Sequence, residues 1–301
     1  MKQFKVDSHL HIYTSWIDPK YEQGPRDLIT LTREFIKRGL NAGTITSFND
    51  NRFDRLIDNS DLPYDWDIKN EDKGVIITTD FGKKFYWFNS DEKPTKQGHI
   101  LLIGNKRQTK HIKPYQNLEE TLGQAEQEVS FIVADHPLMV MKDVRSSGIG
   151  LENLEKYQEY FTAGELNGNC RTIPGIIPKG LNKKTAEVCR ELNLPIIANS
   201  DAYGQGLFLS SRFNLNNPLF CNIGKTYTEY DEDDLDLTSI DNLLKSIKQT
   251  IKQDKQKPVL RNNSGNTYLS ILEHIGFSVF YGKCKDIKFL GINHHGGRVV
   301  E

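Results

Sequence analysis

Short apolar runs alternate with amphipathic segments along most of this chain. The runs at 42–46, 131–134 and 195–198 have the length and composition of buried strands, whereas 27–38 and 238–251 place apolar residues at helical spacing. Alternating strands and helices predict an α/β fold with a parallel sheet. The 301 residues hold about seven such units, which favours closure into a barrel over a small open sheet.

The remaining segments complete the expected order of elements. Further strands are expected at 4–8, 74–79, 84–88, 99–104 and 163–166, and further helices at 117–127, 151–160 and 181–192. A hairpin is expected around Asp80-Phe81-Gly82, and the polar stretch 49–72 is expected to be a loop. Residues 1–255 are therefore expected to form one barrel domain, with 256–301 as a C-terminal extension packing on it.

The composition argues against several classes of protein. The net charge of −1 provides no overall basic field for bulk nucleic-acid binding. The chain has neither an apolar stretch that could span a membrane nor an apolar signal core at its start, so a cytoplasmic location is expected. The cysteines form no CxxC pair and are expected to be reduced packing residues; they are Cys170, Cys189, Cys221 and Cys284.

Histidines and acids gather at the expected strand ends. The candidates are His9, His11, His99, His136, Glu165 and Asp201. His9 and His11 are two residues apart, so in an extended backbone both point to the same side. The carboxyl ends of the strands of a parallel barrel meet at one mouth, although His99 opens its strand instead of ending it. Histidine and carboxylate together suit zinc, manganese or iron, so the sequence predicts a metal site.

Several of these residues also have a structural explanation. Asp201 could cap a helix, and His136 could be a turn residue. Glu165 could pair with Arg171 or Lys179, and these two cations could instead bind a substrate phosphate near the start of the helix at 181–192. His111 and His274 lack a strand-end position and are expected to be structural or exposed. The pair His294-His295 resembles a metal-binding pattern, but near the chain end it is expected to form a turn.

Five short motifs in order resemble the PHP (polymerase and histidinol phosphatase) family. They are Asp7-Ser8-His9-Leu10-His11, Gly98-His99-Ile100-Leu101-Leu102-Ile103-Gly104, Ala134-Asp135-His136-Pro137, Gly164-Glu165-Leu166-Asn167-Gly168 and Asn199-Ser200-Asp201-Ala202. The resemblance implies a distorted (β/α)7 TIM-like barrel that holds two or three metal ions and hydrolyses phosphoesters. It also implies the metal ligands His9, His11, His99, His136 and Asp201. Glu165 would have a supporting or anion-facing role.

The chain departs from the family pattern at several positions. Ser47 and Phe48 stand where the family has an Asp-His pair, and Tyr203 stands where it has a histidine. Tyr203 could donate a hydrogen bond to a substrate oxygen or merely fill the space of that histidine. Trp16 replaces an aspartate, with Asp18 nearby. The expected third strand, 74–79, offers only isoleucines where the family has a glutamate, so fewer metal ions are expected.

Two functions from different classes follow from these observations. The first is a metal-dependent phosphoesterase, which hydrolyses phosphoric esters with a metal-activated water and a reduced site for zinc, manganese or iron. Its substrate would be a phosphorylated small molecule or a nucleic-acid end. The second is a catalytically inactive PHP-like module that binds a ligand, a nucleic acid or a partner, because Phe48 and Ile76 would make the mouth apolar. An unrelated barrel with coincidental histidines is a third interpretation, which the distances among these side chains would decide.

Overall fold

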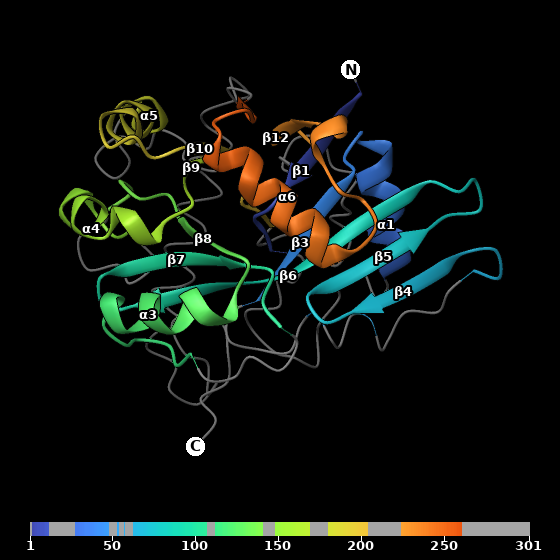
Figure 1. Ribbon diagram of the computed structural model, residues 1–301, viewed down its shortest axis with the longest axis horizontal. Helices are drawn as coiled ribbons and strands as arrows, with labels where there is room; N and C mark the ends of the chain where they lie inside the picture. Colours follow the sequence, from blue (N-terminus) through green and yellow to red (C-terminus); the bar gives the residue numbers. More distant parts are fainter. Residues whose placement is uncertain are drawn as a thin grey trace, which may run out of the picture.

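The computed structural model describes residues 2–11, 28–47, 53, 57, 63–106, 112–140, 148–168, 180–203 and 224–260 (Figure 1). Its α-helices are α1 (Leu28–Lys37), α3 (Leu118–Glu128), α4 (Leu151–Lys156), α5 (Leu181–Glu191) and α6 (Ile240–Lys252). Its strands are β1 (Gln3–Asp7), β2 (Leu10–His11), β3 (Ala42–Ser47), β4 (Asp67–Glu71), β5 (Gly74–Thr78), β6 (Lys84–Thr95), β7 (Gly98–Ile103), β8 (Phe131–Ala134), β9 (Ala163–Asn167), β10 (Ile196–Asn199), β11 (Ala202–Tyr203), β12 (Thr226–Asp231) and β13 (Lys257–Leu260). Two 3₁₀ helices are also present, η2 (Gln158–Tyr160) and η3 (Glu232–Asp234).

One mixed sheet forms the centre of the fold. Its strands follow the order β10-β9-β8-β7-β6-β3-β1-β12-β13, and β5 and β4 extend it outward from β6. The expectation of a parallel sheet is wrong for six of its ten described strand pairs. Three of these antiparallel pairs join β5, β6, β7 and β8 in sequence, and the others are β4–β5, β1–β12 and β12–β13. The physical reason is the short connections. Hairpins at 79–83 and 96–97 join β5, β6 and β7, and such turns reverse the chain where a crossover helix would keep it parallel.

The sheet curves into a nearly closed barrel whose two ends are joined by side chains. Thr228 of β12 places its Oγ1 against the backbone of Ala198 in β10, where it accepts from the N–H at 2.9 Å and donates to the C=O at 3.1 Å. Gln256 Nε2 donates to the carbonyl of Ile196 at 3.0 Å. Near the mouth, the backbone N–H of Ser8 donates to Asn199 Oδ1 at 2.9 Å. The predicted α/β fold with a barrel-like sheet is thus confirmed.

Helix α6 packs on the inner face of the sheet. Its residues Leu243, Leu244, Ile247 and Ile251 share one hydrophobic cluster with inward residues of nine strands, such as Phe4 and Phe88. The other helices cover the outer face: α1 packs against β6, α3 and α4 pack against β7 and β8, and α5 packs against β9. Ser239 caps α6 by accepting from Asn242 N at 3.1 Å, so the helix expected at 238–251 begins just after this residue.

Several elements differ from those expected from the sequence. Part of the polar stretch 49–72 forms β4, whose sequence DIKNE lacks apolar alternation because it lies at the edge of the sheet. Strand β6 continues to Thr95, seven residues beyond the expected end at residue 88. Strand β12 was not expected, and β13 pairs with it in the same sheet immediately after residue 256. Residues 261–301 of the expected extension lie outside the described residues.

In the described ranges, no helix combines the length and the hydropathy that crossing a membrane requires.

Candidate metal centre

All five expected metal ligands meet in one buried cluster at the mouth of the barrel. His9 Nε2 lies 3.0 Å from His11 Nε2, and His11 Nε2 lies 3.3 Å from Asp201 Oδ1. His136 and His99 join them through Glu92, a residue that the sequence analysis did not select. Asp135 and Glu165 also belong to this cluster, and each of these eight residues is less than a tenth exposed. The convergence argues against the interpretation of coincidental histidines.

Strand periodicity explains why these side chains face one another. Alternate residues of a strand point to the same face. On β8, Phe131 and Val133 belong to the inner hydrophobic cluster, and Asp135 continues their alternation. The same rule places Glu92 in line with Tyr86 and Phe88 of β6. Each strand is therefore apolar where it passes α6 and polar where it reaches the mouth.

Glu92 corrects one expectation from the sequence. The glutamate that we considered lost was sought at 74–79, on β5, but the strand that pairs with β3 is β6. Glu92 lies near the end of β6 and is fully enclosed by the cluster. Ile76, which we expected at the mouth, instead packs in the hydrophobic cluster with α6. Ile76 therefore does not make the mouth apolar, and it no longer supports the alternative of an inactive module.

The reversed direction of β7 accounts for His99. This histidine opens its strand, but β7 runs antiparallel to both β6 and β8. The start of β7 consequently lies at the same end of the barrel as the C-terminal ends of the parallel strands. His99 Nδ1 there contacts Glu92 Oε1. The sequence offered no local signal for this placement.

His136 and Asp201 adopt backbone conformations that are rare for residues with side chains. Their φ angles are +26° and +45°. Such conformations cost on the order of 1–3 kcal/mol each and persist where the surroundings enforce them, most often at functional sites. In both cases the unusual backbone lies two residues after the end of a strand and directs the side chain into the cluster. His136 is thus a turn residue and a member of the site at once.

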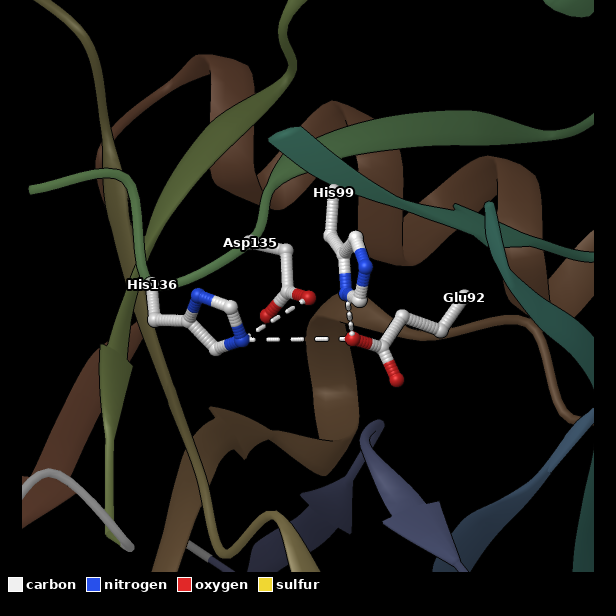
Figure 2. A group of neighbouring side chains, drawn as sticks. All are labelled: Glu92, His99, Asp135 and His136. Atoms are coloured by element: carbon white, nitrogen blue, oxygen red, sulfur yellow. Dashed lines mark hydrogen bonds and ion pairs between the residues drawn. The ribbon is translucent and has the colours of Figure 1, made fainter. Parts of the chain in front are cut away.

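The two oxygens of Glu92 face two different groups of possible ligands. Oε2 lies 3.2 Å from His11 Nε2 and 3.9 Å from His9 Nε2. Oε1 contacts His99 Nδ1 and lies 3.9 Å from His136 Nε2. Asp135 completes the second group, and Figure 2 shows these side chains pointing toward one another from β6, β7 and the end of β8. One carboxylate thus links two potential metal sites.

Glu165 supports the cluster from β9 by accepting hydrogen bonds. Its Oε1 accepts from His9 Nδ1 and from Asn199 Nδ2, each at 2.9 Å. Its Oε2 accepts from the backbone N–H of His136 at 3.1 Å and from Asn167 Nδ2 at 3.0 Å. Burial opposes the charge of Glu165, but His9 beside it holds the pKa of Glu165 below its usual range. Glu165 thereby fixes the orientation of His9 and leaves Nε2 of that ring facing His11.

The electrostatics of the cluster suit a cation. Burial opposes the ionisation of Glu92, yet His99 holds its pKa well below the usual range. Burial also raises the pKa of Asp135 well above its usual range, and the nearby charges of Glu165 and Glu92 act in the same direction. In the described part of the chain, the ion-pair partners of these three carboxylates are histidines, never lysine or arginine. Divalent ions supply the positive charge that such a set lacks.

The donor atoms also fit the size of a metal ion. Within each possible group the ligand atoms lie no more than 4.8 Å from one another. Two ligands on opposite sides of an ion, each at about 2.1 Å, are about 4.2 Å apart. Imidazole nitrogens mixed with carboxylate oxygens are typical ligands of zinc, manganese and iron. The cluster could therefore hold a metal ion with small side-chain shifts.

Other expected site residues are not described. Arg171 and Lys179 lie outside the described residues, as do Trp16, Asp18 and Phe48. For Tyr203 the backbone pairs with His11 through β11 and β2, which brings this residue to the mouth. Of the expected packing cysteines, Cys189 is buried between α5 and β9, and the other three lie outside the described ranges. The histidines set aside as structural or exposed lie outside these ranges as well.

Comparisons with known proteins bear on the fold alone. No protein-family model matches the chain, and no curated protein matches it either. Among solved structures, the chain is similar to the crystal structure of PsfC from Pseudomonas syringae PB-5123, with 13% sequence identity and a TM-score of 0.54. The similarity covers 94% of this chain and 100% of that chain. The chain therefore shares the overall fold of PsfC, and its function has to be argued from its own site.

Proposed function

We propose that this chain is a metal-dependent phosphoesterase with a distorted (β/α)7 barrel of PHP type. The observation that carries the proposal is the meeting of four histidines with Glu92 and Asp201 at one point of the barrel mouth. These residues come from five separate segments of the chain, and an ordinary buried core does not accumulate so many ionisable groups. Five of the six are ligands that the resemblance to the PHP family implies.

The ligands would be divided between two cations that share Glu92. His9, His11 and Asp201 lie on the side of Glu92 Oε2, and His99 and His136 lie on the side of Oε1. Divalent ions held by these residues would polarise phosphoryl oxygens and lower the pKa of water. The expected number of ions is then higher than one, because the shared glutamate is present.

The chain's own residues prepare the site for this chemistry. Glu165 holds the proton of His9 at Nδ1, so that the Nε2 lone pair is free for a cation. Asn167 Nδ2 donates to both Glu165 Oε2 and Asp201 Oδ2 at 3.0 Å, and it thus fixes the positions of these two carboxylates relative to each other. We further propose that Arg171 and Lys179 bind the substrate phosphate. Tyr203, next to His11, would donate a hydrogen bond to a substrate oxygen.

The direct test is hydrolysis by protein purified without chelator. The substrates would be p-nitrophenyl phosphate and bis(p-nitrophenyl) phosphate, each with added Mn²⁺ or Zn²⁺. We expect metal-stimulated release of nitrophenol that EDTA abolishes, and a loss of about 100-fold or more in Glu92→Gln. The matched control is Glu155→Gln, the same substitution at an exposed position of α4, which should retain full activity.

The proposal fails if Glu92→Gln hydrolyses both esters as fast as the unchanged protein does. It also fails if neither metal stimulates any hydrolysis. Bound metal without hydrolysis of any phosphoester would favour the alternative, a PHP-like module that binds a ligand, nucleic acid or partner.

A further inference from the structure

Asp135 is the one carboxylate of the cluster to which neither the family resemblance nor the proposed function assigns a role. It follows β8 directly, is fully buried, and continues the inward alternation of Phe131 and Val133. Neither of its side-chain oxygens has a hydrogen-bond partner among the described residues. Burial of a carboxylate without hydrogen-bond donors costs several kcal/mol of lost hydration, and the nearby histidines His9 and His136 offset only part of this cost.

The neighbours of Asp135 do not explain it as a structural residue. Its Oδ1 lies 3.4 Å from His9 Nδ1, but Glu165 Oε1 lies closer, at 2.9 Å, and accepts the hydrogen of that nitrogen. Its Oδ2 lies 3.2 Å from His136 Nε2, the ring nitrogen that also faces Glu92. Asp135 therefore faces the nitrogen that His136 would offer to a cation.

The four side chains around this point match one coordination sphere. An oxygen of Asp135, an oxygen of Glu92, a nitrogen of His99 and a nitrogen of His136 all lie within 4.8 Å of one another. In Figure 2 the four side chains converge from three neighbouring strands. The arrangement offers two nitrogens and two oxygens, a set that suits a tetrahedral or higher coordination.

We propose that Asp135 is a direct ligand of the second cation, together with Glu92, His99 and His136. This inference rests on the proposed metal-dependent function. With Asp135, each cation has two histidines and one aspartate of its own and shares Glu92 with the other. Without it, the second cation has only three protein ligands. The two divalent charges are then balanced by Glu92, Asp135, Asp201 and the nearby Glu165.

The test measures metal binding and not activity. Equilibrium dialysis of the metal-free full chain with Mn²⁺ should give two ions per chain, and their proximity should produce an exchange-coupled electron paramagnetic resonance signal. Asp135→Asn keeps the size of the side chain but is a poor ligand. We expect it to bind one ion with unchanged affinity and the second at least about 10-fold more weakly, with the signal of an isolated Mn²⁺.

Two comparisons make the result specific. Asp201→Asn should weaken the other ion, so the double variant should lose both. The exposed control Glu155→Gln should bind as the unchanged chain does. Because Asp135→Asn could fail to fold, anomalous diffraction from crystals of the unchanged chain grown with Mn²⁺ provides a second readout. There, an Asp135 oxygen should lie about 2.0–2.3 Å from one of two metal peaks.

The proposal is overturned if Asp135→Asn binds both ions as tightly as the unchanged chain, or if only one ion binds. It is equally overturned if both peaks appear and Asp135 coordinates neither. These outcomes leave metal-dependent phosphoester hydrolysis itself intact, although binding of a single ion would also contradict the sharing of Glu92 by two cations. Conversely, two ions coordinated as described with no phosphoester hydrolysis would remove the proposed function and retain the role of Asp135. A chain that binds no metal at all would remove both.

Discussion

Asp7 shows how strongly burial acts on single residues near the mouth. Its carboxyl group is fully buried, and Oδ1 accepts from the backbone N–H of Ser200 at 3.0 Å. Its other oxygen, Oδ2, has no hydrogen-bond partner in the described part of the chain. Burial raises the pKa of Asp7 to about 7 from 3.8. The folded protein therefore keeps this proton at a pH where the unfolded chain has released it.

This difference predicts a pH-dependent effect of Asp7→Asn on the metal-free protein. Between pH 4 and 7 unfolding releases the proton of Asp7, so this residue lowers the free energy of unfolding progressively as pH rises. Asparagine does not titrate, so the variant lacks this pH-dependent contribution to the free energy of unfolding. Its side-chain oxygen can still accept the hydrogen bond from the backbone N–H of Ser200. The stability of the variant relative to the unchanged chain should therefore increase by roughly 2–4 kcal/mol from pH 4 to pH 8.

Urea unfolding in EDTA at several pH values measures this difference. The control is Asp80→Asn, the same substitution at an exposed hairpin residue, for which we expect a difference that does not vary with pH. A constant difference for Asp7→Asn across this range would contradict the assignment of a buried, protonated carboxyl group.

At the scale of elements, β9 and α5 approach so closely that the strand requires a glycine. A methyl group added at Gly164 would lie 2.5 Å from Cys189 Sγ, and the next nearest atom is at 3.6 Å. The small residue thus lets α5 settle on the strand that carries Glu165. Overpacking of such a contact costs typically 1–3 kcal/mol.

We expect Gly164→Ala to destabilise the fold by about that amount and Cys189→Ala to relieve most of it in the double variant. The physical reason is that Cys189→Ala removes the single atom that a new methyl group would meet. Thermal or denaturant unfolding of the four proteins gives the coupling energy. Gly123→Ala in α3 is the matched control, because a methyl group there meets nothing within 4 Å and should stabilise the helix. Strictly additive effects of the two substitutions would refute the contact.

At the scale of the whole molecule, side-chain hydrogen bonds link β10 and β12, between which the described residues form no backbone strand pairing. Thr228 satisfies both the N–H and the C=O of Ala198 across the gap between β12 and β10. These two hydrogen bonds set the distance between β12 and β10. They thereby set the position of β10, and of Asp201 just after it, relative to β1. The mouth depends on this closure because its ligands come from both ends of the sheet.

Thr228→Val should therefore destabilise the protein by about 1–3 kcal/mol, because it leaves a buried backbone N–H without its acceptor. Denaturant unfolding measures the loss. Thr226→Val provides a control on the same strand, since Thr226 is equally buried and its hydroxyl oxygen has no hydrogen-bond partner among the described residues. That substitution should be neutral or stabilising. An equal loss in the free energy of unfolding for both variants would show that the hydrogen bonds of Thr228 to Ala198 do not stabilise the closed barrel.

The sequence by itself determined the elements and part of the site. Apolar runs and helical spacing predicted most strands and helices, because both signals lie within a few residues. His9, His11, His136 and Asp201 were predicted for the same reason, since each lies within a few residues of the end of an apolar run. The polar strand β4 and the long end of β6 carry no such signal, and they were missed.

Only the tertiary structure decided which other side chains complete the site. The family resemblance predicted His99 as a ligand, but His99 faces the mouth only because β7 runs antiparallel. Glu92 does so because β6, not β5, pairs with β3. Strand direction and pairing depend on contacts between residues far apart in the chain, which no local pattern records. The inward position of Asp135 could have been inferred from its alternation with Phe131 and Val133. Its lack of hydrogen-bond donors, however, becomes visible only when the neighbouring strands are in place.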